Sequence, residues 1–369
     1  MTLPPRKLIN PLNNLIIDLA SPINLSFIWN IGSLLGFCLS LQIITGLLLS
    51  IHYIPNADTA FASVSHIIRE VNIGWALRNF HANGASIFFL IIYIHILRNL
   101  IFSSFKNTHT WSSGVTIYIL TIATAFIGYL LPWGQIRFWG ATVITNLFSA
   151  IPYAGKIIVE WLWGGFGVAS PTLTRFFALH FILPLIIAAL AIIHLIFLHT
   201  HGSQGPLGDQ TALIKTPFHV HFSTKDLLGL LGLILLLNIV STFFPLSLSD
   251  PENFIPANPL VTPTHIKPEW YFLWAYAILR SIPNKLGGVI AIFSALLLLY
   301  LLPMSPSIQT STKLRTKYFI IIILSRTFLL LTWIGGNPVE APFILIGQIL
   351  TSIYFLALLT LIILPSPPL

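Results

Sequence analysis

The stretch that decides the fold is WALRNFHANGASIFFLIIYIHILRNLIF, residues 75–102. It is longer than the roughly 20 apolar residues that a helix needs to cross a bilayer. It also contains His81 and His95, which stand 14 positions apart. Fourteen residues at 100° each return to within about 40° of the starting face and advance about 21 Å along the axis. The spacing therefore predicts a membrane helix with two imidazoles stacked on one face.

A second apolar run, residues 173–199, repeats this pattern with His180 and His194, again 14 positions apart. The two runs are the second and the fourth in the chain, so both cross the membrane in the same direction. We therefore expect His81 and His180 at one depth and His95 and His194 at another. Two imidazoles that face each other can bind one haem iron from both sides. The iron then has no open position for oxygen, which favours electron transfer over oxygen chemistry.

Glycines repeat at the same interval in the first and third apolar runs. Gly32 pairs with Gly46, and Gly114 pairs with Gly128. These runs cross in the opposite direction, so Gly46 and Gly128 fall at the outer level of histidines and the other two fall at the inner level. A porphyrin edge needs a backbone without side chains at such points. The ladder predicts two non-covalently bound b-type haems between four helices.

Arg78 and Arg98 each lie three residues from a ladder histidine, where the propionates of a haem require a cation. For a single residue there is a simpler interpretation, because an intramembrane histidine can be a packing or proton-relay group and glycine is common in membrane helices. The agreement of eight residues in spacing and depth is what favours the haem interpretation.

The composition restricts the protein to a membrane class. Charged residues make up 8% of the 369 residues, apolar residues 56%, and the mean hydropathy is +0.88. The net charge of +8 is spread between apolar runs and forms no basic face for nucleic acid. Cys38 is the only cysteine, which excludes a disulfide framework and a cysteine-bound haem or cluster. We expect an all-α polytopic protein with eight spans, near residues 29–51, 75–102, 112–132, 173–199, 226–245, 287–303, 318–334 and 342–364.

The even number of spans places both termini on one side of the membrane. Basic residues favour that side as the inner one, although the opposite loops carry a comparable number of them. The outer loops are long and rich in aromatic residues and proline. In the first of them, residues 61–71 show helical spacing of apolar residues, which is compatible with a helix at the membrane interface or with ordinary loop packing.

Five strings carry a resemblance to a known family. They are GWALRNFHANGAS, GYLLPWGQIRFWGATVITNLFSAIPY, TLTRFFALHFILP, PEWYFLWAYAILRSIPNKLGG and LTWIGG. Over essentially its whole length the chain resembles the cytochrome b family of the bc1 complexes, with the mitochondrial members as the nearest match. The related b6 proteins differ because their later helices belong to a separate polypeptide and their fourth-helix histidines are spaced one residue wider.

The resemblance implies a ubiquinol–cytochrome c reductase with a quinol-oxidising site outside and a quinone-reducing site inside. At the outer site Glu269 would act as proton acceptor, because a carboxylate among aromatic groups can take up a quinol proton. Tyr129 and Tyr276 would wall the pocket. The remaining positions that the family assigns to this site are Gly140, Pro268, Trp270 and Tyr271. At the inner site the matching residues are His199, Ser203 and Asp226, and a histidine with a carboxylate suits proton delivery to reduced quinone.

The same resemblance implies the assembly and the location. We expect an N-terminal haem-binding bundle with the outer quinone loop over residues 1–205 and a C-terminal unit over residues 206–369. The expected partners are the Rieske iron-sulfur protein, cytochrome c1 and the other bc1 subunits in a dimeric complex, together with ubiquinone and membrane lipids. The expected location is the mitochondrial inner membrane, with both termini on the matrix side. Two other functions remain open from the residues alone, namely a proton-coupled transporter that uses the histidines as a relay and another bis-histidine haem reductase.

Overall fold

The computed structural model describes residues 17–203, 205, 214–306 and 311–364 of the 369-residue chain. The boundary expected at residues 205 and 206 falls at the edge of a segment that lies outside the described residues. Eight helices in the described part are long and apolar enough to cross a membrane, which confirms the predicted number. They are Phe27–Ser50, Gly74–Ile101, Thr108–Leu130, Ser170–His201, Phe218–Phe243, Lys285–Met304, Arg315–Gly335 and Phe343–Ile363.

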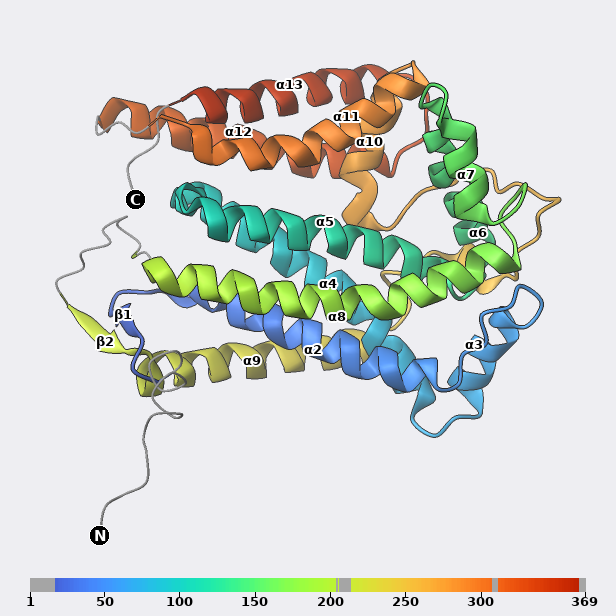
Figure 1. Ribbon diagram of the computed structural model, residues 1–369, viewed down its shortest axis with the longest axis horizontal. Helices are drawn as coiled ribbons and strands as arrows, with labels where there is room; N and C mark the ends of the chain where they lie inside the picture. Colours follow the sequence, from blue (N-terminus) through green and yellow to red (C-terminus); the bar gives the residue numbers. More distant parts are fainter. Residues whose placement is uncertain (1–16, 204, 206–213, 307–310, 365–369) are drawn as a thin grey trace, which may run out of the picture.

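Four of these helices form a bundle, which Figure 1 shows at the centre of the molecule. Its members are α2 (Ile31–Ser50), α4 (Gly74–Ile101), α5 (Thr108–Leu130) and α8 (Ser170–His201). Helix α2 packs along α4, and α5 packs along α8. Each glycine-bearing helix is thus paired with one histidine-bearing helix. Apolar lipid gives membrane helices little hydrophobic drive to associate, so close packing at small residues stabilises such pairs.

The later helices pack on two sides of this bundle. Helix α9 (Phe218–Phe243) lies against α2 and α4, although it belongs to the predicted C-terminal unit. On the other side of the bundle, α12 (Ser311–Gly335) and α13 (Phe343–Ile363) pack together and against α10 (Leu273–Ser281), while α11 (Lys285–Leu297) packs on α10 (Figure 1). A short 3-10 helix, η7 (Leu298–Met304), extends α11.

The loops at one end of the bundle contain further short helices. These are α3 (Ala60–Arg69), α6 (Gln135–Asn146) with η4 (Leu147–Ala150), α7 (Gly155–Trp163), η5 (Pro251–Phe254) and η6 (Trp270–Phe272). In Figure 1, α3, α6 and α7 gather at the right-hand end of the long helices. Helix α3 confirms the helical interpretation of this segment over residues 60–69, and its Ile68 is 38% exposed. Its position at the membrane interface stays a prediction.

The opposite end of the bundle is formed by short connections. A two-stranded antiparallel sheet pairs β1 (Ala20–Pro22) with β2 (Lys215–Pro217). The 3-10 helix η2 (Phe27–Asn30) leads into α2, and η3 (Ser104–Lys106) joins α4 to α5. The elaborate loop structure therefore lies at one end of the molecule, the end predicted to face outward.

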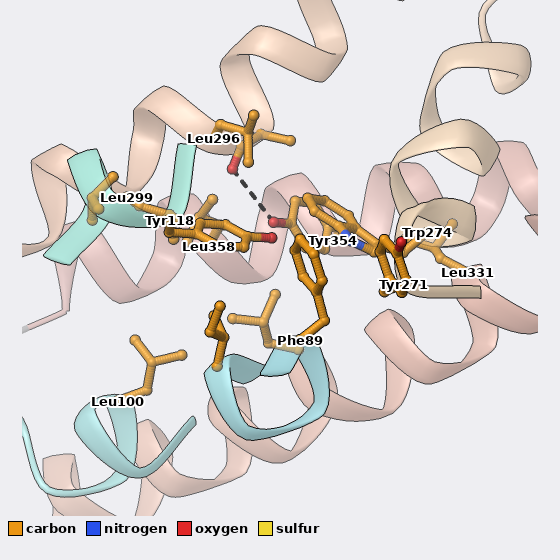
Figure 2. Close-up of a cluster of buried hydrophobic side chains, with 14 of the residues drawn as sticks. Phe89, Leu100, Tyr118, Tyr271, Trp274, Leu296, Leu299, Leu331, Tyr354 and Leu358 are labelled. Atoms are coloured by element: carbon orange, nitrogen blue, oxygen red, sulfur yellow. Dashed lines mark hydrogen bonds between the residues drawn. The ribbon is translucent and has the colours of Figure 1, made fainter. Parts of the chain in front are cut away.

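An aromatic core joins the bundle to the C-terminal helices (Figure 2). The rings of Phe89 and Tyr271 stack with centroids 4.2 Å apart and planes 1° from parallel. Tyr93 Oη donates to the carbonyl of Tyr271 at 2.5 Å, and Trp274 Nε1 donates to Tyr93 Oη at 3.2 Å. Stacked aromatic pairs contribute about 0.5–1.5 kcal/mol beyond their buried area. The segment around Tyr271 is thereby fixed to α4, the helix that carries His81 and His95.

Candidate functional site

The outer level of the histidine ladder places His81 of α4 opposite His180 of α8. Their ring centroids are 6.2 Å apart, and their planes are 82° apart. Histidine nitrogens bind metals at about 2.0–2.1 Å. Two such bonds plus the distances from nitrogen to ring centre fit within the observed separation. The pair has the spacing that one shared iron requires.

Glycine is needed opposite each of these rings. A Cβ placed on Gly46 would lie 3.1 Å from His81 Cε1. A Cβ placed on Gly128 would lie 2.6 Å from His180 Nδ1, which is closer than real Cβ contacts. The ladder glycines therefore make room for the imidazoles themselves, in addition to any porphyrin edge.

Hydrogen bonds determine which ring nitrogen faces the shared space. Thr45 Oγ1 donates to the carbonyl of Leu41 and lies 2.9 Å from His81 Nδ1, so the ring N–H donates to the hydroxyl. His180 Nδ1 lies 2.9 Å from the carbonyl of Thr124, which can only accept. Both rings consequently carry their proton on Nδ1 and keep the lone pair of Nε2 for a metal.

The inner level repeats the glycine contacts and, at His194, the hydrogen bond to Nδ1. Ser113 Oγ donates to the carbonyl of His109 and lies 2.9 Å from His194 Nδ1. A Cβ on Gly114 would lie 3.1 Å from His194 Cε1, and one on Gly32 would lie 3.9 Å from His95 Cε1. All four predicted glycine–histidine pairs are therefore brought together.

Both predicted arginines lie beside the ladder. Arg78 lines the cavity that His81, His180 and Gly128 share. At the inner level, Arg98 Nε and His95 Nδ1 are buried without a hydrogen-bond partner. The Arg98 guanidinium lies 5.5 Å from the ring centroid of Trp29. A buried guanidinium N–H without an acceptor fits a missing anionic group such as a haem propionate.

A second cavity, of about 400 Å³, opens among the outer loops. Five of the residues expected at the quinol site line it, namely Tyr129, Gly140, Pro268, Glu269 and Tyr276. A Cβ on Gly140 would meet nothing within 4 Å, so the glycine contributes open space. Tyr276 Oη donates to the carbonyl of Ile266 at 3.1 Å, which fixes the ring as a wall.

Glu269 stands between the two cavities, because it lines both. It precedes η6 and is 7% exposed. Its Oε1 lies 2.8 Å from Arg137 Nη1 of α6, although the N–H is not aligned well enough for a hydrogen bond. Burial raises the pKa of the Glu269 carboxyl above its ordinary value, and the Arg137 guanidinium opposes that rise. A buried carboxylate with a raised pKa binds a proton more readily than an exposed one.

Comparisons with known proteins agree with this geometry. The family model described as cytochrome b/b6/petB matches residues 16–202, and the one described as cytochrome b (C-terminal)/b6/petD matches residues 256–355. The chain is similar to a solved chain of a hyperthermophilic respiratory complex III, with 33% identity, 96% of each chain covered and a TM-score of 0.90. The chain belongs to the cytochrome b family.

Two residues expected in the quinol site of this cytochrome b have other surroundings. Trp270 packs against Tyr93 and Tyr271, with ring centroids 6.5 Å and 5.7 Å away. Tyr271 is 3% exposed and faces the cavity of the outer histidines. Neither is among the residues that line the second cavity. Both instead belong to the aromatic core beside the loop that carries Glu269.

Arg137 is the functional residue that sequence reasoning missed. It lies within the string GQIRFWG and is 8% exposed, with its guanidinium 3.8 Å from the ring centroid of Tyr129. A buried charge needs a partner, so an arginine beside the apolar LPW segment was a usable signal. Its partner Glu269 is 132 positions away in the sequence, so the pairing can be recognised only in the folded structure.

The residues expected at the inner site of this cytochrome b lie on or just after two helices that share a neighbour. His199 is near the end of α8 and Asp226 is in α9, and both helices contact α2. The Nδ1 atom of His199 is buried without a hydrogen-bond partner, while Ser203 follows the end of α8. None of the three lines either of the two cavities described above, and their common role stays a prediction.

Proposed function

We propose that this chain is the cytochrome b subunit of a mitochondrial respiratory complex III and forms the catalytic core of a ubiquinol–cytochrome c reductase. The family and the likeness to a respiratory complex III chain support this role. The single observation that carries it is the ladder of four histidines, each opposite a glycine of a neighbouring helix, with the outer pair spaced for one iron.

His81 with His180 and His95 with His194 would hold two b-type haems, and Arg78 and Arg98 would pair with their propionates. When bound, such haems supply one-electron transfer between the two sides of the membrane. The chain's contribution is to fix the tautomers of His81, His180 and His194 by hydrogen bonds to Nδ1 and to leave open backbone at the ladder glycines. Within the described residues no group of three or more histidine, cysteine or acidic side chains gathers, which fits sites that use only two protein ligands each.

The outer cavity would bind the quinol. Tyr129 and Tyr276 offer flat walls with a polar end, and Gly140 leaves room for a ring. Glu269 would take the quinol proton, because its burial favours uptake and its position between the two cavities lets it face either one. The aromatic packing of Tyr271 against Phe89 and Phe272 supports the loop that carries Glu269.

At the opposite end of the bundle, His199 and Asp226 would deliver protons to a quinone undergoing reduction, with Ser203 as a hydrogen-bonding partner. The expected partners of the chain are the Rieske iron-sulfur protein and cytochrome c1 on the outer side, in a dimeric complex. The chain would lie in the mitochondrial inner membrane with its termini toward the matrix.

A proton-coupled transporter is not favoured. A relay would hydrogen-bond the histidines to one another along the bundle. Instead, His81, His180 and His194 each direct Nδ1 to a threonine or serine group of an adjacent helix, and His81 and His180 face each other across the bundle.

The test is a dithionite-reduced minus oxidised optical spectrum of the purified complex, with haem and iron measured per cytochrome b chain. Two b-type haems per chain, together with quinol-dependent reduction of cytochrome c, are expected. A folded preparation without b-type haem would overturn the proposal and restore the transporter. The variant His180→Leu should lose the outer haem, and normal content of both haems in that variant would end the ligand assignment.

A further inference from the structure

The buried ion pair between α6 and the loop before η6 is the feature that the proposed function leaves unexplained. Among the described residues there are three ion pairs, and only Arg137 with Glu269 has both side chains nearly buried, at 9% and 5% exposure. Removing two charges from water is costly unless their attraction and further contacts offset the loss. Because burying both charges is costly, we expect this pair to have a function other than holding two segments together.

We propose that Arg137 is the positioning residue of the outer quinol site, holding the Glu269 carboxylate ionised and in place between the two cavities. The inference rests on the proposed function, since it assigns Arg137 a task in the same reaction.

The contacts of Arg137 support this assignment. Its Nη1 faces Glu269 Oε1 at 2.8 Å and donates to the carbonyl of Lys267 at 3.4 Å. Its guanidinium stacks on Tyr129 with 3.8 Å to the ring centroid. One planar cation thus contacts a wall of the quinol cavity, the backbone of the loop that carries Glu269, and the carboxylate itself. Its Nε is buried without a partner and provides a further donor.

The charge of Arg137 also determines when Glu269 can accept a proton. Burial raises the pKa of the Glu269 carboxyl, the nearby Asp250 adds to the rise, and Arg137 counteracts both. Asp250 is itself paired with Lys267 at 3.6 Å, which weakens its effect on Glu269. The other titratable or charged side chains lining the two cavities around Glu269 are Arg78, His81, Tyr129, His180, His265, Tyr271, Tyr276 and Arg280. None of these is ion-paired with Glu269, so Arg137 is the dominant favourable charge among the described residues.

The sign of the pH effect follows directly. Glu269 accepts a proton only when it is ionised, so quinol oxidation declines as the pH falls through the pKa of its carboxyl. An opposite charge within about 4–6 Å lowers the pKa of a carboxyl group by roughly 1–3. Loss of the arginine charge should therefore move the acid limb of the pH profile upward by about that amount. Within that limb, the rate at a fixed pH falls about tenfold each time the pKa rises by one.

The experiment measures reduction of cytochrome c by a short-chain ubiquinol across pH, using assembled complexes with Arg137→Gln, Arg137→Lys, Glu269→Gln, and Arg137→Gln combined with Glu269→Gln. Arg137→Gln should move the acid limb upward, and Arg137→Lys should restore it because the charge is kept. In the Glu269→Gln background, Arg137→Gln should cause no further change of the pH profile. The optical spectrum of the b haems controls for folding in each complex.

The outcomes separate the two proposals. If Glu269→Gln leaves the acid limb intact, Glu269 is not the acceptor and the proposed mechanism of the outer site fails. If Glu269→Gln removes the limb but Arg137→Gln leaves it in place, only the inference about Arg137 fails. Should Arg137→Gln not assemble, Arg137→Lys decides, because an acid limb displaced by about 1 on the pH scale or more despite the retained charge contradicts the electrostatic role.

Discussion

At the residue scale, the ladder glycines differ in how strictly they are required. The four positions were expected to serve a porphyrin edge, yet the distances show a gradient of contact with the imidazoles. Gly128 leaves no room for a methyl group beside His180, whereas Gly32 leaves an ordinary van der Waals distance to His95. Alanine substitutions at these glycines should therefore show whether the missing side chain makes room for the histidine ring or for a bound porphyrin.

The first prediction concerns Gly128→Ala. The added Cβ would lie 2.6 Å from His180 Nδ1, so the ring must turn away from its bond to the Thr124 carbonyl. Overpacking of this kind costs about 1–3 kcal/mol. We expect loss or a spectral shift of the outer b haem and a slower quinol oxidation, read from the optical spectrum and the steady-state rate.

Two matched variants sharpen this prediction. Gly36→Ala on α2 is the control, because its Cβ would meet nothing within 4 Å, and it should leave both haems unchanged. Gly32→Ala distinguishes the two reasons for glycine. If it disturbs the inner haem as strongly as Gly128→Ala disturbs the outer one, the porphyrin and not the imidazole sets the requirement.

At the element scale, the sequence predicts the membrane-spanning helices but not the contacts between residues that are far apart in the chain. All eight spans were found because hydrocarbon thickness fixes their length and apolar character. Helix α9 nevertheless extends further toward the N-terminus than residue 226, with a kink at His219, because His221 and Lys225 lower the hydropathy of its first turns without ending the helix. The histidine levels could be predicted because a spacing of 14 is a local property. The Arg137–Glu269 pair could not, because it joins α6 to a loop that the fold alone brings near.

The second prediction concerns the contact between α12 and α10. Gly335 ends α12 against the start of α10, where a Cβ would lie 2.6 Å from the carbonyl carbon of Leu273. Gly335 also lines the quinol cavity. Gly335→Ala must push the two helices apart, at a cost of about 1–3 kcal/mol. We expect faster thermal inactivation of the complex and a higher KM for quinol.

The control for this substitution is Gly232→Ala on α9, where a Cβ would meet nothing within 4 Å. It should leave the inactivation rate and the KM unchanged. If Gly335→Ala also leaves the inactivation rate and the KM unchanged, the contact between α12 and α10 does not support the site and the packing argument is wrong.

At the scale of the whole molecule, the asymmetry of its two ends is the main result. One end carries α3, α6, α7 and the loop with Glu269, and the other carries the small β1–β2 sheet and short connections (Figure 1). The aromatic core in Figure 2 packs the C-terminal helices against α4, so the loop with Glu269 is attached to the helix that carries His81. Both sets of loops carry a comparable number of basic residues, so the charges alone do not decide which end faces which side of the membrane. The predicted orientation therefore requires a direct test.

The third prediction tests this orientation by labelling with a membrane-impermeant maleimide. Tyr153, before α7, is fully exposed and Met304, at the end of η7, is 74% exposed, so a cysteine at either position would be accessible in the isolated chain. The native Cys38 is 3% exposed and provides a silent background. In mitochondria with the outer membrane opened, Tyr153→Cys should be labelled, and Met304→Cys should react only in inverted inner-membrane vesicles. Labelling in the reverse order would invert the topology and would place Glu269 with the matrix, so that quinol protons would be released inside and the reaction would no longer build a gradient across the membrane.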